Sequence, residues 1–493
     1  MTERKLDVRP WLVAAAVVAI LVGAALLRFV DLGTNPGGLF SDEAYEGYDA
    51  QQLLHVPGFH PVFFTDGGGR EALFAYVVAA VFRAAGETTL ALRGTAAGIG
   101  VVGVLAIWLL GRRFGVAAGL AAAAWAAGSL WLICVSRDGM RNTLVPLFAA
   151  LSLLALIAWR DRPSRRMASL AGAVAAAATL YTYQPLKLLP LLVLVWLLWL
   201  RRIDRTGYER MRANFVAFVA AFVLVGVPML AAAGSDPGTY FGRAVGTTLG
   251  STDLVAHWLR TIGMFALTGD PNQRHDVDGL PLLGVPLTLL ALAGVARLWR
   301  NRHNAAEALI LLSIPIFLVP PLVATEGGAP HFLRSLGLAA PLAITIGLGA
   351  AEVIERARGR LGTAGARITA AGVAAGLVAL AIGGGSAYLS RPIADRFSPY
   401  SYELVAMAAA ARGAGNVVIV DDYSSTVIRF LDATQLPTIV MPAATIIEPD
   451  RYRAIFALSR ADLGRALGST VAAHARAVAR DPAGRPTVWA VIP

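Results

Sequence analysis

Charged residues are scarce in this chain, and cysteine is almost absent. Only 15% of the 493 residues are charged, whereas a soluble globular protein has about a quarter. Hydrophobic residues make up 56% of the sequence, and the mean hydropathy is +0.61. This composition excludes an ordinary soluble enzyme and predicts a membrane protein with many spans.

The single cysteine and the net charge exclude two further classes. Cys134 lies in an apolar run, so no disulfide forms within the chain and the redox compartment is not indicated by cysteine usage. A net charge of +11 would suit a nucleic-acid partner, but the basic residues stand in short clusters between apolar runs. Because that distribution orients membrane helices, we expect no nucleic-acid binding.

About eleven apolar runs are each long enough to cross a bilayer. They cover residues 11–30, 88–111, 115–135, 143–159, 168–183, 186–200, 213–232, 281–299, 305–323, 335–354 and 367–389. No small-residue cleavage site follows the first run, which is therefore expected to stay as an uncleaved span. The fold class predicted is an all-α polytopic membrane protein with about eleven transmembrane helices.

The run at residues 71–86 decides the topology, because counting it as a span reverses the side of every later loop. Without it, the main basic clusters share one side, with about twenty Lys and Arg there against about eight in the opposite loops. The positive-inside rule then predicts a cytoplasmic N-terminus in a plasma (inner) membrane. It makes 71–86 an interfacial helix on the outer face, where the long loops also lie.

The sequence changes in character after about residue 390. Short apolar runs at 417–420, 438–441 and 487–492 predict strands, and residues 424–432 predict a helix. We therefore expect a membrane domain at 1–389 and a small extracytoplasmic α/β domain at 390–493.

The most informative polar stretch is SDEAY at residues 41–45, directly after the first apolar run. Carboxylates beside a bilayer are costly unless they are used, and they can accept a proton from a hydroxyl or hold a divalent cation. In a helix, Asp42 shares one face with Tyr45 and Glu46, and that face is able to line a cavity. A solvated first turn with Ser41 or Asp42 as its N-cap fits the same spacing.

Two more polar clusters lie on the predicted outer face. The loop at residues 136–142 contains Arg137, Asp138 and Arg141. Two guanidinium groups in so tight a turn suit a phosphate, but arginines at helix ends also snorkel to the interface. Arg70 and Glu71 open the 71–86 run after three glycines, and Glu71 is either a metal ligand or the ion-pair partner of Arg70.

Three later segments carry similar alternatives. Lys187 stands at a helix end, where it either meets a lipid phosphate or anchors the helix among headgroups. The segment 269–276 has two aspartates near His275, which suits a metal, but its Asp-Pro-Asn sequence also forms turns. His331 and Arg334 lie one helical turn apart and either bind a phosphate together or cap and anchor a helix.

These residues together resemble the C-type superfamily of membrane glycosyltransferases, in particular glycosyltransferase family 39. That family includes protein O-mannosyltransferases and lipid A aminoarabinose transferases. The resemblance covers about residues 10–390 in plan, and it is specific in the Asp42-Glu43 loop, the Arg70-Glu71 helix and the loop at 136–141. It implies a hexosyl- or pentosyltransferase that takes its sugar from a polyprenyl phosphate, among membrane lipids, on the outer face. The acceptor is unknown.

The resemblance also implies roles for single residues. Asp42 is the catalytic acid/base with Glu43 beside it, and Asp138 supports the same cavity. Glu71 matches the glutamate of the family's Glu-Lys-Pro element and, with His275, is a candidate ligand of a divalent metal. This chain has Ala72 where that element has lysine. Other residues then bind the substrate and its phosphate: Arg70, Arg137, Arg141, Tyr45, Lys187, His331 and Arg334.

In the expected reaction an acceptor hydroxyl or amine attacks the anomeric carbon in one step with inversion. No nucleotide is needed, in keeping with the absence of a P-loop or G-x-G-x-x-G element on the cytoplasmic side. The main rival interpretation is a transporter or flippase for lipid or glycan, which predicts two related halves with ionisable groups at mid-membrane. The second rival interpretation is a structural or assembly protein with an exported tail, which gives no function to Asp42 and Glu43.

Overall fold

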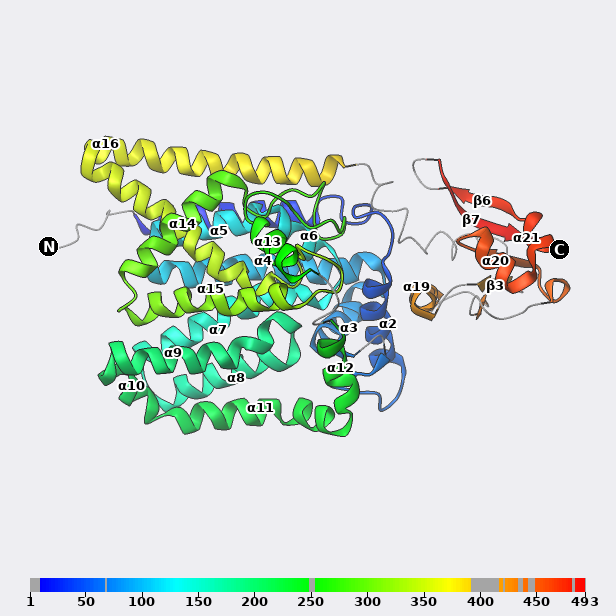
Figure 1. Cartoon of the computed structure of the whole chain (residues 1–493), viewed down its shortest axis with the longest axis horizontal. Coiled ribbons are helices and arrows are strands. Elements are labelled where there is room, and N and C mark those ends of the chain that lie inside the picture. Colours follow the sequence, from blue (N-terminus) through cyan, green and yellow to red (C-terminus); the bar gives the residue numbers. More distant parts are fainter. Residues whose placement is uncertain are drawn as a thin grey trace.

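The computed structural model describes residues 9–66, 69–247, 253–391, 416–419, 422–432, 438–441, 448–480 and 484–492. Long helices form a bundle, and a small sheet with short helices lies beyond one end of it (Figure 1). The helices of the bundle are α1 (Pro10–Phe29), α2 (Ser41–His55), α3 (Leu73–Ala85), α4 (Thr89–Gly111), α5 (Val116–Gly128), α6 (Leu130–Arg137), α7 (Leu144–Asp161), α8 (Arg165–Tyr181), α9 (Leu189–Ile203), α10 (Arg205–Arg212), α11 (Phe215–Ser235), α12 (Pro237–Thr247), α13 (Leu254–Gly263), α14 (Gly284–Arg300), α15 (Ala305–Val323) and α16 (Ala339–Ser390).

Six helical segments of the described chain are long and apolar enough to cross a membrane, and the bent pair α5–α6 makes a seventh. The chain is thus a multi-pass membrane protein. Every predicted apolar run is helical, but α8, α9 and α14 have only 17, 15 and 17 residues. The last two runs form the single element α16, which turns back at Gly362, where φ is 69°. The predicted count of eleven spans is therefore not confirmed.

Glycines let several of these helices approach closely. A Cβ atom on Gly294 of α14 would lie 1.9 Å from the carbonyl oxygen of Thr345 in α16. A Cβ atom on Gly172 of α8 would lie 2.1 Å from the carbonyl oxygen of Phe218 in α11. Backbone contact at small residues is how helices associate where no water drives them together.

The bend of 55° between α5 and α6 is supported by an arginine from α1. Arg28 is buried, and its guanidinium donates to the carbonyl oxygens of Ala126 and Ala127 at 3.1 and 3.0 Å. These carbonyls end α5 and have no partner within their own helix. The bend directs α6 toward the turn that contains Asp138.

Helices α2 and α3 lie together at one end of the bundle (Figure 1). A two-stranded antiparallel hairpin joins them, formed by β1 (Phe63–Phe64) and β2 (Arg70–Glu71). With 13 residues, α3 is about 20 Å long, too short for a hydrocarbon core of about 30 Å. The length of α3 agrees with the prediction that residues 71–86 do not form a span.

The C-terminal residues form a mixed five-stranded sheet in the order β4-β3-β5-β7-β6. Strands β4, β3 and β5 are parallel, and β7 and β6 are antiparallel to their neighbours. The predicted strands are confirmed, as is the predicted helix; β5 and β6 were not predicted. The elements are β3 (Asn416–Ile419), α19 (Asp422–Asp432), β4 (Thr438–Met441), β5 (Ala454–Ala457), α20 (Arg460–Leu467), α21 (Ser469–Ala473), β6 (Arg476–Arg480) and β7 (Pro486–Val491). The division into domains at residue 390 stays a prediction.

Cysteine labelling tests the two ends of the bundle. Ala80 on α3 and Thr206 on α10 are exposed near opposite ends (Figure 1), and the native Cys134 is buried. We expect Ala80→Cys to react with an impermeant maleimide from outside intact cells, and Thr206→Cys to react only after permeabilisation. Labelling of both cysteines from the same side would contradict this topology.

Candidate functional site

The carboxylates of α2 are in two different environments. Glu43, Glu46 and Asp49 are buried, whereas the side chain of Asp42 is 28% exposed. The helix begins at Ser41, and its N-cap is Phe40, with no side-chain cap from Ser41 or Asp42. The alternative in which Ser41 or Asp42 is the N-cap of this helix is therefore wrong.

Glu43 joins α2 to α4 and to the turn after α6. Its Oε1 and Oε2 each accept a hydrogen bond of 2.9 Å from Arg93, and its Oε1 also accepts from the backbone N–H of Gly139 at 2.8 Å. Burial alone would raise the pKa of the Glu43 carboxyl, but Arg93 and these N–H groups lower the pKa below its ordinary value. Glu43, predicted to be catalytic beside Asp42, thus occupies a positioning site in the structure.

A chain of ion pairs connects the next turn of α2 to the hairpin. The guanidinium of Arg141 lies 2.7 Å from Glu46 and 3.2 Å from Glu71. On its other oxygen, Glu71 meets the ammonium of Lys187 at 3.3 Å. The charge of the Glu71 carboxylate is thus neutralised by two side-chain cations. A metal ligand at Glu71 stays a prediction.

Arg70 and Tyr45 complete this group of polar side chains around α2, which we call the polar layer. Arg70 makes a buried ion pair with Asp49, and its guanidinium lies 4.6 Å from the ring centroid of Tyr45. The structure thus brings Arg70 of β2 against Tyr45 of α2, and Arg70 pairs with Asp49 instead of Glu71.

Two predicted phosphate ligands bind backbone carbonyl groups instead. Arg137 donates to the carbonyl oxygens of Leu27 and Asn35 at 3.0 and 2.6 Å, and it lies over the ring of Tyr388. Arg334 donates to the carbonyl oxygen of Ala324 at 2.9 Å and is mostly buried. These contacts give both guanidinium groups a structural role.

Arg274 is the residue that sequence reasoning missed. Its Nη1 lies 3.4 Å from Oδ2 of Asp42, although 232 residues separate the two. The guanidinium carbon lies 3.3 Å from the ring centroid of Phe40, and 16% of the side chain is exposed. The signal available in the sequence was that Arg274 is the one Lys or Arg between Arg260 and Arg297.

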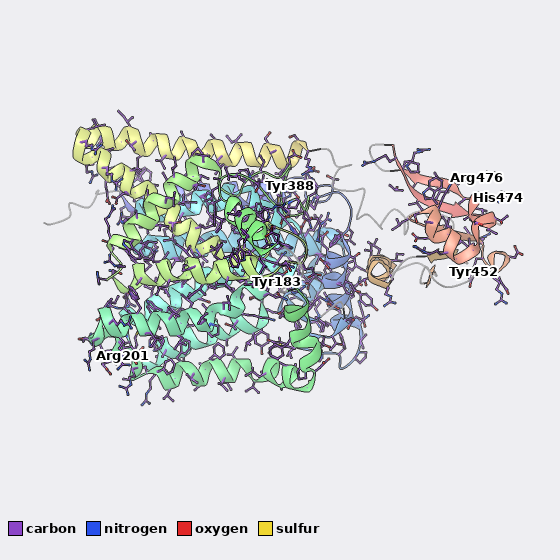
Figure 2. All side chains as sticks on the ribbon, in the orientation of Figure 1. Tyr183, Arg201, Tyr388, Tyr452, His474 and Arg476 are labelled. Atoms are coloured by element: carbon purple, nitrogen blue, oxygen red, sulfur yellow. The ribbon has the colours of Figure 1, made fainter. Side chains whose placement is uncertain are left out.

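A small cavity lies beside this pair. Oε1 of Gln273, which helps line it, is buried and has no hydrogen-bond partner in the described part of the chain. Tyr388 stands where α16 reaches the end of the bundle that carries α2 (Figure 2). The cavity is lined by Pro36, Gly37, Gly38, Phe40, Glu43, Asp138, Gln273, Arg274 and Tyr388. Asp138 therefore shares a cavity with the partner of Asp42.

Three side chains near Arg274 form a cluster suited to a metal ion. Asp270, His275 and His331 each offer a ligand atom, and these atoms lie within 4.8 Å of one another. Oδ2 of Asp270 is 2.9 Å from Nδ1 of His275 and also accepts from the backbone N–H of Phe332 at 2.7 Å. Within the described chain, Nε2 of His275 and Nδ1 of His331 are buried without a hydrogen-bond partner.

The electrostatics of this cluster keep both imidazoles neutral. Burial lowers the pKa of His275, and burial together with the neighbouring His275 lowers the pKa of His331 to about 3. Burial raises the pKa of Asp276 to about 8, so the second aspartate of the segment is a poor anion, and His331 takes its place in the cluster. Neutral imidazole and carboxylate are the donor types that Zn²⁺ prefers.

Glu43 and Asp42 should respond differently to loss of charge. Glu43→Gln leaves the buried Arg93 without its counter-ion, which costs about 3–5 kcal/mol. We expect a clear fall in the unfolding temperature of the detergent-solubilised protein, and a change within about 0.5 kcal/mol for the partly exposed Asp42→Asn.

The same contacts predict a pH dependence. Since the pKa of Glu43 is lowered in the folded state, its stabilisation is complete above the ordinary glutamate pKa and is lost as pH falls through the lowered value. Equal unfolding temperatures for Glu43→Gln and Asp42→Asn would contradict the positioning role of Glu43.

Comparison with known proteins gives one family match. Residues 71–230 match the model of the dolichyl-phosphate-mannose-protein mannosyltransferases. No curated protein matches the chain in sequence.

Solved structures match over nearly the whole chain. ArnT from Cupriavidus metallidurans bound to undecaprenyl phosphate is 14% identical with a TM-score of 0.61, over 98% of this chain and 99% of that one. The oligosaccharyltransferase of Archaeoglobus fulgidus in complex with Zn and sulfate is 13% identical with a TM-score of 0.56, over 93% of this chain and 70% of that one. The chain thus shares the fold of these membrane proteins, and residues 71–230 are similar to the mannosyltransferase family, in agreement with the resemblance seen in the sequence.

Proposed function

We propose that this protein transfers a sugar from a polyprenyl-phosphate donor to an acceptor on the outer face of the membrane, with Asp42 as the acid/base group. The observation that carries the proposal is the contrast within α2. Its other three carboxylates are buried against guanidinium groups, and only Asp42 is partly open, beside Arg274. A carboxylate in that position is able to reach a substrate hydroxyl or amine.

The donor class is supported by the molecules bound to the structural relatives. ArnT was crystallised with undecaprenyl phosphate, and the A. fulgidus oligosaccharyltransferase is also known with a dolichol-phosphate. Both are polyprenyl phosphates. A donor of this kind needs a cation for its phosphate and a groove open to lipid for its tail.

Lys187 is the best candidate for the phosphate contact. Its side chain is 28% exposed, and its ammonium lies 3.3 Å from Glu71, beside the position where the family's element has a lysine and this chain has Ala72. The ring of Tyr240 lies 4.7 Å from the ammonium and supports it from α12. Lys187 would thus supply from η4 (Gln184–Leu188) the charge that the hairpin lacks.

The reaction follows from these placements. Asp42 takes the proton as the acceptor oxygen or nitrogen forms a bond to the anomeric carbon, and the bond from that carbon to the phosphate oxygen breaks. The phosphate leaves with the bonding electron pair, and Lys187 and Arg274 stabilise its growing negative charge. A single displacement of this kind inverts the anomeric configuration.

The sidedness of the site is inferred from charge. Figure 2 shows Arg201, in one of the basic clusters, at the end of the bundle opposite to Tyr388. Because basic clusters stay in the cytoplasm, the end with α2 and Tyr388 faces outward, and the sheet domain lies outside a plasma membrane.

We further propose that Asp270, His275 and His331 hold a divalent metal such as Zn²⁺. The matching oligosaccharyltransferase was solved with Zn, and the neutral imidazoles and orphaned nitrogens here fit such an ion. A cation at this place would add to the positive field at the phosphate. Arg274, directly before His275, connects the cluster to Asp42.

Loss of the Asp42 carboxylate should abolish turnover and leave the fold intact. We expect Asp42→Asn to reduce sugar transfer from a polyprenyl-phosphate donor by about 10²- to 10⁴-fold, because the acceptor loses its base. The control is Asp31→Asn, an exposed aspartate before α2, which should transfer at the normal rate. Unchanged transfer by Asp42→Asn would reject the assignment.

Metal binding is tested without an activity assay. We expect purified protein to hold zinc, measured by atomic emission, and to lose it in His275→Ala and in His331→Ala. His303→Ala, an exposed histidine after α14, should keep the zinc of the unsubstituted protein. Equal zinc content in all four proteins, or none in the unsubstituted one, would contradict the site.

A further inference from the structure

Helix α19 has two apolar sides that pack against different parts of the protein. Ile428 packs with Val418 of β3 and Phe456 of β5 in the core of the sheet. Val427 and Phe430 belong to another core, with residues of α2, α3 and α4. Figure 1 shows α19 between the bundle and the sheet. The helix therefore links the C-terminal sheet to the helices that build the site.

The contact with α2 is closely fitted. Gly47 leaves the space that the ring of Phe430 fills, since a Cβ atom there would lie 2.5 Å from the Cε2 atom of Phe430. The ring also stacks on Phe82 of α3, with centroids 6.1 Å apart. Nε2 of the buried Gln51 donates to the carbonyl oxygen of Phe430 at 3.0 Å, which satisfies a carbonyl in the last turn of α19.

These contacts lie on the side of α2 opposite to its acidic face. With about 100° of rotation per residue, Asp42, Glu46 and Asp49 fall on one face of the helix. Gly47 and Gln51, four residues apart, fall on the opposite face. Guanidinium groups hold α2 from the first side, and α19 holds it from the second.

We propose that α19 is a clamp that holds α2 in place, and that Phe430 is a positioning residue for Asp42. The inference rests on the proposed function of Asp42 and extends it to the C-terminal domain. Ion pairs tolerate small changes in distance. By contrast, the ring of Phe430 fits tightly into the space between Gly47 and Phe82, which we call the socket, and this fit defines the position of α2 along its own axis. The acidic face of α2 then meets Arg274 and Arg141 only while the socket is filled.

The test changes the side-chain volume at Phe430 and at Gly47, the two residues that meet in the socket. Phe430→Ala empties the socket, and Gly47→Ala blocks it although alanine favours the helix more than glycine does. Gly47→Ala combined with Phe430→Leu restores space for an apolar side chain. Arg429→Ala, at an exposed position of α19, is the matched control. Two quantities are measured in the full-length protein: hydrogen exchange at the amides of residues 41–55, and steady-state transfer.

We expect Phe430→Ala and Gly47→Ala each to speed exchange in α2 and to lower kcat at least tenfold with little change in the KM for the donor. The double variant should recover to within threefold of Phe430→Leu alone, and Arg429→Ala should behave as the unsubstituted protein. Unchanged exchange in α2 for Phe430→Ala, or no recovery in the double variant, would overturn the clamp. If the unsubstituted protein transfers no sugar, the proposed function fails, and the exchange rates alone then decide whether α19 holds α2.

Discussion

The structure of the site depends on the neutralisation of three buried carboxylates on one short helix. Glu43, Glu46 and Asp49 would each be costly to bury alone, and an arginine meets each of them. These arginines come from α4, the segment before α7 and the hairpin before α3. Because breaking any of these pairs leaves an unpaired buried charge, the pairs hold the acidic face of α2 against the bundle.

A fourth carboxylate of α2, that of Asp42, is the acid/base group of the proposed reaction. Asp42 stands in the first turn of α2, partly open, and meets Arg274 from the loop after α13. The same loop brings His275 to His331 and Asp270, so the proposed base, its arginine partner and the candidate metal ligands are connected through residues 270–275. Lys187 pairs with Glu71 at the end of the ion-pair chain that starts at Glu46, and it is the proposed contact for the donor phosphate.

Local patterns in the sequence were enough to predict the long helices and three of the strands. Each long apolar run became a helix, and alternation of short runs after residue 390 correctly indicated strands and a helix. The number of spans was not settled, since α8, α9 and α14 are short and α16 combines two runs across Gly362. Strands β5 and β6 escaped prediction, and β6, with Arg476 and Arg480 at its ends, has no buried residue.

The sequence did not predict which side chains form pairs, because the partners lie far apart along the chain and no local pattern relates them. Asp42 and Glu43 are neighbours, yet Glu43 meets Arg93 while Asp42 meets Arg274. Arg137 suited a phosphate by its residue type, but the bend at α6 brings it to the carbonyl groups of Leu27, in the last turn of α1, and of Asn35, after that helix. His331 was predicted to bind a phosphate together with Arg334, and the fold places its ring 5.2 Å from that of His275, a neighbour that the sequence did not indicate.

The central claim is that this polar layer transfers sugars from polyprenyl phosphates. The most direct measurement incubates the purified protein in lipid nanodiscs with a panel of polyprenyl-phosphate sugars and a mixture of envelope lipids, glycans and peptides as acceptors. The account predicts release of polyprenyl phosphate and a glycosylated product of inverted anomeric configuration with at least one donor. Turnover of nucleotide sugars alone, with every polyprenyl-phosphate donor left intact, would contradict it.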